Sequence, residues 1–370
     1  MDYTFELNNA RKDDMFTTNQ VKAKSPVVEV FSAMADGKEL SSLKINEKVV
    51  NKASDYILGL ATKAASSDLS AISELNTIRK FVIEPKLLQE IKLLSVFGSY
   101  KQLGWNETPE IETYKWLGVE SNIQAEGTDV SFPIRKTDKY PIAPITISGG
   151  YAVNYRELAL GNLSRENEGM EEVRKDIRNK AALYVIETVF NAIENATGIK
   201  YFYENSTLAK ADVDALLAKI RRFGKPNVIA DYAVLSQFIP WVGYFGTVSA
   251  KEIVGISQKV LDEIADTGLV GTYLGSVLRE MPNPYNFNKR NATGDNFDTL
   301  LPAGLALVTP AGQSVSAIQT FTQGGLTSFT GNDVTNGTVV SRFDLAVAAG
   351  VAKGRETEVG IIHDSALDSL

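Results

Sequence analysis

The most regular hydrophobic pattern in the chain lies between residues 164 and 198. Apolar side chains recur there at helical spacing along two faces, which predicts one long helix. Acidic residues after Ser164 suit the positive end of a helix, and Gly198 is expected to end it. Such a helix would extend about 45 Å at 1.5 Å per residue. The two apolar faces consist of Val173, Ile177, Ala181 and Tyr184, and of Ala182, Ile186, Val189 and Ile193.

The region before that helix divides into a polar start and a helical part. Residues 1 to 40 are polar apart from the island SPVVEVFSAMA, which predicts an arm that is ordered only where something covers it. Apolar spacing predicts a helix over residues 45–65 and a second from a cap at Ser67 or Asp68, interrupted near Pro85. Two interpretations stay open. The helical region is either a cap packed on the rest of the chain or an arm that reaches neighbouring subunits.

Strict alternation of polar and apolar residues replaces helical spacing after residue 104. The runs DVSFPIRK and PITISGGYAVNY alternate in this way, and turn residues lie at 126–128, so a long two-stranded excursion is predicted. A hairpin this polar buries too little to stand alone and needs a partner surface. The alternative is an ordinary pair of strands in a larger sheet. The candidate inter-subunit contacts on this hairpin are the charged residues Glu120, Glu126, Arg135, Lys136 and Lys139.

Helices and strands are expected to alternate over residues 205–312, which predicts a compact α/β unit. The pattern favours helices over 210–224, over 232–243 with an end at Pro240, and over 249–268. It favours a short strand over 225–231 and a buried strand within 299–312. Residues 314–343 are rich in Gly, Thr, Ser and Asn and predict strands and loops. Two strand-like runs joined at Gly354 end the chain.

The composition removes most of the usual catalytic chemistry. The 370 residues contain no cysteine and a single histidine, His363. Disulfides, thiolate nucleophiles, zinc–thiolate sites and iron–sulfur clusters are therefore excluded, and neither a cofactor nor a metal site is expected. The absence of other histidines lowers the expectation of an enzyme, although carboxylate or lysine chemistry stays open.

Charge and hydropathy limit the classes of partner that the chain is expected to bind. The net charge is −7 and no long basic run is present, so strong binding of nucleic acid through its phosphates is not expected. No apolar run is long enough to span a membrane. The first sixteen residues, MDYTFELNNARKDDMF, lack the apolar segment of a signal peptide, which predicts synthesis in the cytosol.

Four local motifs suggest chemistry, and each has a plainer interpretation. Gly268, Gly271 and Gly275 lack the spacing of a nucleotide-binding loop. The same stretch could form a helix-turn-helix, but only Arg279 could serve as a basic reader. Residues 283–298 contain the carboxylates Asp295 and Asp298, together with Lys289 and Arg290, but lack calcium-loop spacing, which favours a solvated loop. His363 precedes an aspartate and a serine, but neighbours on a strand point to opposite faces and cannot form a triad. A surface or sheet-edge histidine is expected.

The order of the elements, rather than any motif, resembles the major capsid proteins of tailed phages, the Hong Kong 97 fold family. The segment GTDVSFPIRKTDKYPIAPITISGGYAVNYREL is similar to the second limb of that family's extended hairpin, the E-loop. It leads into ENEGMEEVRKDIRNKAALYVIETVFNAIENATG, which is similar to the spine helix. DEIADTGLVGTYLGSVLREMPNP resembles a segment of the axial domain, which implies a strand over 272–281 and argues against a helix-turn-helix. The final SRFDLAVAAGVAKGRETEVGIIHDSAL resembles the last peripheral strands.

This resemblance implies an α+β fold of the Hong Kong 97 type and a division of the chain. An N-terminal arm and helical region would occupy residues 1–104, and the E-loop 105–152. The peripheral domain with its spine helix would occupy 153–204, the axial domain 205–312, and the returning peripheral strands 313–370. The N-terminal region is long for a simple arm in that family, so a built-in scaffold-like segment is one interpretation of it.

The function implied is that of a major capsid protein, not an enzyme. Copies would assemble through pentamers and hexamers into an icosahedral shell that encloses double-stranded DNA without sequence-specific binding. Scaffold, portal and decoration proteins are potential partners, the membrane is not, and the expected location is the virion after synthesis in the host bacterial cytoplasm. An acidic wall suits the containment of DNA. Two alternatives stay open: an encapsulin-like nanocompartment shell of the same fold, and a carboxylate-dependent enzyme on the α/β unit.

Overall fold

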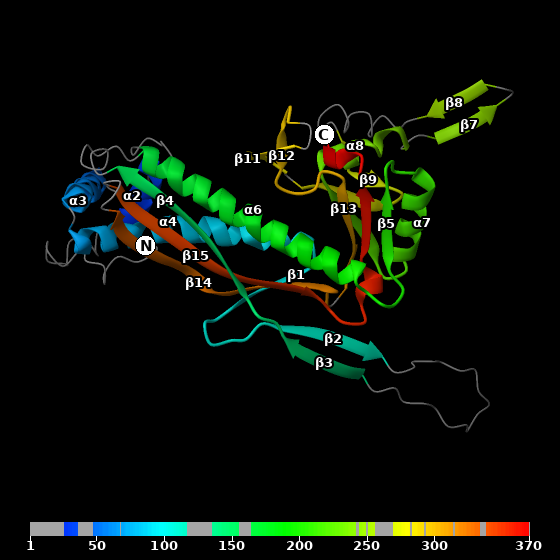
Figure 1. Ribbon diagram of the computed structural model, residues 1–370, viewed down its shortest axis with the longest axis horizontal. Helices are drawn as coiled ribbons and strands as arrows, with labels where there is room; N and C mark the ends of the chain where they lie inside the picture. The colour runs from blue at the N-terminus through cyan, green and yellow to red at the C-terminus, as the bar shows by residue number, and fades with distance from the viewer. Residues whose placement is uncertain are drawn as a thin grey trace.

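The computed structural model of this chain shows a mixed α+β molecule (Figure 1). It describes residues 26–35, 47–66, 68–116, 135–154, 164–241, 244–248, 251–255, 269–281, 283–291, 294–313, 315–333 and 338–369. The helices are α2 (Pro26–Ala35), α3 (Glu47–Ala65), α4 (Leu69–Lys92), α6 (Ser164–Glu194), α7 (Lys210–Ile220) and α8 (Tyr232–Ser236), with short 3₁₀ turns η2 (Leu93–Val96), η3 (Ile239–Trp241), η4 (Glu356–Glu358) and η5 (Leu367–Ser369).

The strands form two larger sheets and three separate hairpins. The first sheet has the order β1-β14-β15-β4 and contains β1 (Ser99–Leu103), β4 (Ile145–Asn154), β14 (Ile318–Asp333) and β15 (Thr338–Val351). The second has the order β5-β16-β13-β6-β10-β9 and contains β5 (Tyr201–Asn205), β6 (Lys225–Ala230), β9 (Thr272–Tyr273), β10 (Ser276–Glu280), β13 (Leu305–Ala311) and β16 (Gly360–Asp364). The hairpins pair β2 (Glu110–Trp116) with β3 (Arg135–Pro141), β7 (Tyr244–Val248) with β8 (Lys251–Gly255), and β11 (Tyr285–Arg290) with β12 (Phe297–Thr299).

The long helix predicted from the two apolar faces is confirmed as α6, which has 31 residues. Its apolar side chains pack on β4 and β15, and α4 lies beside it on the same sheet (Figure 1). Ile177, Ala181 and Val189 are fully buried. A Cβ at Gly149 of β4 would lie 3.1 Å from both Ile177 and Val173, so the missing side chain there allows the helix to approach the strand closely.

The predicted end of this helix at Gly198 is wrong. The helix ends at Glu194, four residues earlier. Polar groups rather than a glycine cap close it, because the Asn195 side chain and backbone both donate to Asn191 O and Lys200 Nζ donates to Glu194 O at 2.6 Å.

The predicted interruption at Pro85 is also wrong, since α4 runs unbroken through this residue. A proline inside a helix costs one backbone hydrogen bond and crowds the preceding turn. The cost is offset by burial on both sides of Pro85, because Ile83 and Leu87 belong to the main core. Packing of the flanking turns thus overrides the local preference for a helix break.

The N-terminal helices form a cap on α4, as one of the two open interpretations holds. The island SPVVEVFSAMA forms α2, and its Val30 and Phe31 are buried against α3 and α4. The α3–α4 contact includes a polar pair in which Tyr56 donates a hydrogen bond to Glu74 at 2.5 Å. Burial raises the pKa of the Glu74 carboxyl to about 7. Whether this region also reaches neighbouring subunits stays a prediction.

The second sheet carries the predicted α/β unit, with α7 against one face. Strands β6 and β13 are confirmed over the two runs expected, and Val228 and Val308 at their centres are fully buried. Residues 272–281, where the resemblance implies one strand, instead form two short antiparallel strands, β9 and β10, so the helix-turn-helix is excluded but a turn divides the expected strand. Leu274 and Gly275 turn between them with φ values of +46° and +76°, a tight hairpin turn that favours glycine.

Two helices expected in this unit are corrected. The helix predicted over 232–243 has only one turn as α8, followed by the short η3. Where a helix was predicted from residue 249, residues 251–255 form β8 instead, paired with β7. The remaining part of that prediction, 256–268, lies outside the described residues.

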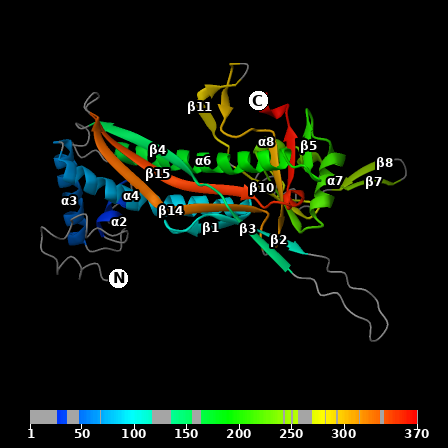
Figure 2. The same ribbon diagram turned by 60° about the horizontal axis from the view of Figure 1, so that its bottom comes forward.

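The two strand-like runs at the C-terminus are confirmed as the end of β15 and as β16. They join the sheets to each other, because β15 lies in the first sheet and β16 in the second. Figure 2 shows that the molecule keeps its elongated shape when turned by 60°, with the first sheet and α6 along its length. The predicted domain boundaries stay a proposal.

Candidate assembly surfaces

The hairpin β2–β3 forms a two-stranded sheet of its own, as the excursion predicted from the sequence requires. Figure 1 shows it leaving the body of the molecule below the first sheet. The second alternating run behaves differently, because its residues form β4, which pairs with β15 over its whole length. The extended hairpin and the ordinary sheet strand therefore both occur, one on each side of residues 142–144.

The structure describes three of the five predicted contact residues. Lys139 is exposed and forms an ion pair with Glu112, its cross-strand partner. Arg135 and Lys136 lie on β3, in register with Trp116 and Lys115. Glu120 and Glu126 lie outside the described residues.

The base of the hairpin is fixed to the first sheet by a small apolar cluster and four hydrogen bonds. Ile111 is 1 % exposed and packs with Leu103 and Phe321. A Cβ at Gly350 would lie only 2.4 Å from the Cδ1 atom of Ile111, so this packing depends on a glycine in β15. Tyr140 packs against the same cluster. The hairpin is therefore anchored at its base over both strands.

Hydrogen bonds fix the register between the hairpin and the sheet. Gln319 donates to Glu112 O at 2.6 Å and accepts from Glu112 N at 3.0 Å, a two-point contact. Tyr140 donates to Val351 O at 2.8 Å, and Thr113 donates to Lys353 O at 3.1 Å. Burial raises the pKa of the Tyr140 phenol above its usual value, so this donor stays protonated at neutral pH.

The sequence analysis predicted the charged strands of the hairpin but not the contacts that hold its base to the first sheet. Gln319 and Tyr140 are unremarkable in the sequence, and the two partners of the Gln319 contact are 207 residues apart. Only the tyrosine within an otherwise charged strand could have indicated a buried position, since Tyr has an apolar ring and a polar tip.

Reversing the charges on β3 is expected to impair assembly and leave the subunit folded. In the variant Arg135→Glu/Lys136→Glu the hairpin loses cationic groups, while its anchor at Ile111 and Tyr140 is unchanged. Circular dichroism and the thermal midpoint should match the parent protein, and light scattering with electron microscopy should show a loss of particles.

A matched control keeps the same change in net charge but moves it to the exposed face of α3. Lys52→Glu/Lys63→Glu should assemble as the parent does. Normal particles from the β3 variant would contradict a role of this hairpin between subunits.

Of the two positions expected for His363, the sheet edge is wrong, whereas its side chain is partly exposed. It lies on β16, between β5 and β13, and its side chain is 15 % exposed. Its Nε2 lies 2.6 Å from Asp368 Oδ2 and its Nδ1 lies 3.2 Å from Glu204 Oε1. The two residues after it point elsewhere, as predicted, because Asp364 accepts a hydrogen bond from Gln237 at 3.0 Å.

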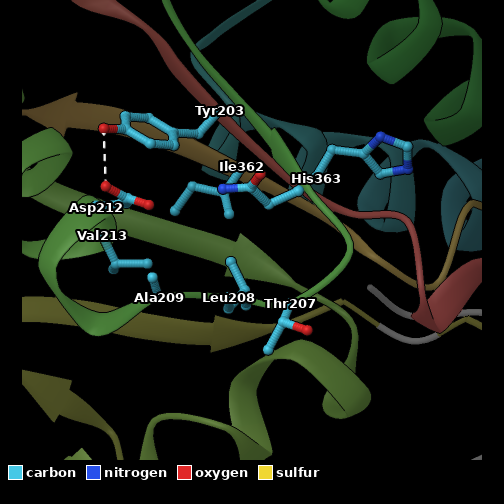
Figure 3. A pocket seen from close by; sticks show the side chains of 9 residues that line it. Tyr203, Thr207, Leu208, Ala209, Asp212, Val213, Ile362 and His363 are labelled. Carbon is cyan, nitrogen blue, oxygen red and sulfur yellow. Dashed lines mark hydrogen bonds between the residues drawn. The ribbon is translucent and has the colours of Figure 1, made fainter.

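The pocket beside His363 offers no room for a substrate. Figure 3 shows Tyr203, Asp212 and Ile362 around it, with Tyr203 donating to Asp212 at 3.0 Å. The cavity holds about 10 Å³, roughly the space of one water molecule. Its lining includes Thr207, Asp212 and His363, but the space among them is too small for a substrate.

The other sequence motifs that suggested chemistry form ordinary structural elements where the structure describes them. Residues 283–298, expected to be a solvated loop, instead contain the hairpin β11–β12, and Lys289 pairs with Asp298 at 2.6 Å. Within the described ranges, no group of three or more metal-ligating side chains occurs. Gly275 serves the β9–β10 turn, and Gly268 lies outside the described residues. In the part of the chain that the structure describes, no helix is long and apolar enough to cross a membrane.

A larger cavity of about 580 Å³ lies between α4, α6 and the second sheet. Its lining combines apolar side chains, among them Leu94, Phe97 and Met281, with the charged residues Glu90, Arg178, Arg279 and Glu280.

Comparison with known proteins identifies the family. Residues 13–363 match the family model of the SPbeta prophage-derived putative capsid protein YonB. The chain belongs to the YonB capsid protein family. No individual curated protein matched the sequence.

Solved structures similar to this YonB family member are shell proteins. One is the mature capsid of bacteriophage PhiM1, with 12 % identity, a TM-score of 0.43, and coverage of 72 % of this chain and 85 % of that chain. Another is the encapsulin complex of Synechococcus elongatus, with 10 % identity, a TM-score of 0.44, and coverage of 75 % and 88 %. A third is a virus-like particle from Pyrococcus furiosus, with 10 % identity, a TM-score of 0.44, and coverage of 76 % and 97 %.

The family confirms that the chain is a capsid protein, as predicted from the sequence. The structure confirms the mixed α+β class, with a helical cap, a projecting hairpin, one long helix and an α/β unit. The assignment of these elements to the domains of the Hong Kong 97 fold stays a proposal. As a YonB family member it is a capsid protein, a structural component of a virion.

Proposed function

We propose that this protein self-assembles through pentamers and hexamers into an icosahedral shell that encloses double-stranded phage DNA. The observation that carries the proposal is the hairpin β2–β3, which is anchored at its base and projects from the body. A polar two-stranded hairpin is marginal by itself, and neighbouring subunits supply the surface that it lacks. Because the base of the hairpin is already ordered before assembly, less conformational entropy is lost when the rest of the hairpin docks on a neighbouring subunit.

The charge of the chain supports the same role. A net charge of −7 limits binding of the wall to packed DNA, so the shell contains DNA without sequence-specific contacts. In this proposal the protein is made in the cytoplasm of the bacterial host, acts with scaffold, portal and decoration proteins, and catalyses no reaction. The contact residues that we propose are Arg135, Lys136 and Lys139 on β3, together with Glu120 and Glu126, which lie outside the described residues.

The first test is electron microscopy of the purified recombinant protein, with light scattering to measure particle mass. Closed shells, or pentamers and hexamers, are the expected result. A monodisperse monomer at every salt and protein concentration, and also with the products of neighbouring genes added as candidate scaffolds, would contradict the proposal. Particles that recruit a specific enzyme and no DNA in the host would favour an encapsulin-like compartment instead.

A further inference from the structure

A second hairpin, β11–β12, carries an exposed aromatic cluster that no charge pattern in the sequence indicated. Tyr285, Phe287 and Phe297 are 48 %, 74 % and 36 % exposed, and Phe287 is the most exposed large apolar side chain among the described residues. The rings of Phe287 and Phe297 meet edge to face, with centroids 5.2 Å apart. Tyr285 pairs with Thr299, which is two positions from Phe297 on β12, so Tyr285 and Phe297 share a face of the hairpin, and the ring contact places Phe287 beside Phe297. The hairpin thus presents one aromatic face to solvent.

The hairpin is held in shape at both ends although little else covers it. At its base, Asn283 donates to Leu301 O at 2.8 Å and accepts from Leu301 N at 2.9 Å. At its tip, the amide group of Asn291 accepts from Gly294 N and donates to Asp295. Among the elements described, β11 and β12 pack extensively only on each other. A rigid arm of this kind loses little conformational entropy when its aromatic face becomes buried.

The shape of the molecule indicates where the partner lies. Figure 1 looks down the shortest axis, and the hairpin projects from the rim of the molecule within that plane. It stands clear of the body in the turned view as well (Figure 2). A hairpin that projects across the shortest axis of the subunit reaches something lying beside the subunit. In a shell built from one chain, that neighbour is another copy.

We infer that the aromatic face of β11–β12 docks on the neighbouring copy of this chain, an inference that rests on the proposed shell function. The contact is heterologous, because an arm that extends sideways meets a different surface of the next copy, and such contacts close into rings. Aromatic side chains in rigid, desolvated positions are typical of the residues that dominate interface energetics.

The test compares three proteins: the parent chain, Phe287→Ser/Phe297→Ser, and the control Leu69→Ser/Ile199→Ser. The control also removes two exposed apolar side chains, each 70 % exposed in the parent. We expect the hairpin variant to need at least about a tenfold higher protein concentration to form particles, since each factor of ten corresponds to about 1.4 kcal/mol. Its circular dichroism and thermal midpoint as a free subunit should equal those of the parent. The control should assemble as the parent does.

The outcomes separate this inference from the shell function. Particles from the parent and, at the same concentration, from the hairpin variant would overturn the docking inference and leave the shell function standing. Equal losses in the variant and the control would also overturn it, because the effect would not be specific to the hairpin. A parent chain that never associates would contradict both.

A second measurement identifies the contact directly. The photoreactive aromatic p-benzoylphenylalanine replaces Phe287 and keeps a ring at that position. Irradiated particles, assembled from a mixture of isotopically light and heavy chains, should contain covalent dimers of one light and one heavy chain, and free subunits should contain none. Cross-links confined to one chain would overturn the inference.

Discussion

Replacing Phe343 by alanine is expected to lower the free energy of unfolding by about 3 to 5 kcal/mol. Phe343 lies on β15 and is fully buried. Its strand is central in the first sheet, between β14 and β4, so the surrounding backbone cannot collapse into the space that the ring leaves. Its ring stacks on Tyr151 of β4, with centroids 6.3 Å apart, and this contact is also lost.

The matched control is Phe329→Ala, a change of the same residue type in the adjoining strand β14. Phe329 is 56 % exposed, so the alanine variant should lose less than about 1 kcal/mol. Urea denaturation of unassembled subunits, followed by circular dichroism, measures both variants. Similar losses at the two positions would show that the first sheet and its helices are not the main source of stability.

The elements that could be predicted from the sequence are those with strong local periodicity. The two apolar faces of α6 fixed its type and approximate length, because each face is buried by a different neighbour. The terminal strands were predictable for the same reason, since their apolar runs fill the two cores. Local pattern was sufficient where burial is nearly complete.

The predictions failed where distant contacts decide the local structure. Pro85 stays helical because residues on both sides are buried under the N-terminal cap and the first sheet. His363 was expected at the surface or at a sheet edge, but β5, 159 residues earlier in the chain, pairs in parallel with β16 and places His363 inside the sheet. The residues near Pro85 and His363 do not indicate these distant contacts.

The candidate surfaces likewise include features that the local sequence predicts and features that depend on distant residues. Charge on Arg135, Lys136 and Lys139 was visible in the sequence and predicted a hairpin that needs a partner. The anchor at Tyr140 and Gln319 depends on residues of β14 and β15, more than 200 positions away. The aromatic face of β11–β12 was missed because residues 283–298 were interpreted through their charges, although three aromatic residues lie among them.

Replacing Arg79 by alanine is expected to destabilise the subunit by about 3 kcal/mol or more. Arg79 of α4 is 1 % exposed, the largest of the fully buried side chains among the described residues. Its Nη1 donates to Ser341 Oγ at 2.9 Å, and its guanidinium carbon lies 5.8 Å from the centroid of the Tyr151 ring. Truncation leaves a cavity between α4 and the sheet and removes the donor to Ser341.

Arg79→Met separates packing from polar contacts in this position. Methionine retains most of the volume but donates no hydrogen bond, so its loss should be about 1 to 2 kcal/mol, clearly smaller than that of alanine. Urea denaturation of unassembled subunits provides the comparison. Equal losses would mean that the polar contacts, and not the filled volume, account for the role of Arg79.

The two destabilising changes are expected to be coupled through Tyr151. This ring lies between the guanidinium of Arg79 and the ring of Phe343, so removing either neighbour frees it to move toward the space left by the other. In a double-mutant cycle, Arg79→Ala/Phe343→Ala should lose about 1 kcal/mol less than the sum of the single losses. Strict additivity would mean that Tyr151 keeps its position in each single variant, and that α4 and β15 are stabilised independently. Coupling would show that α4, β4 and β15 act as one unit, which is the rigid support that a subunit with projecting hairpins requires.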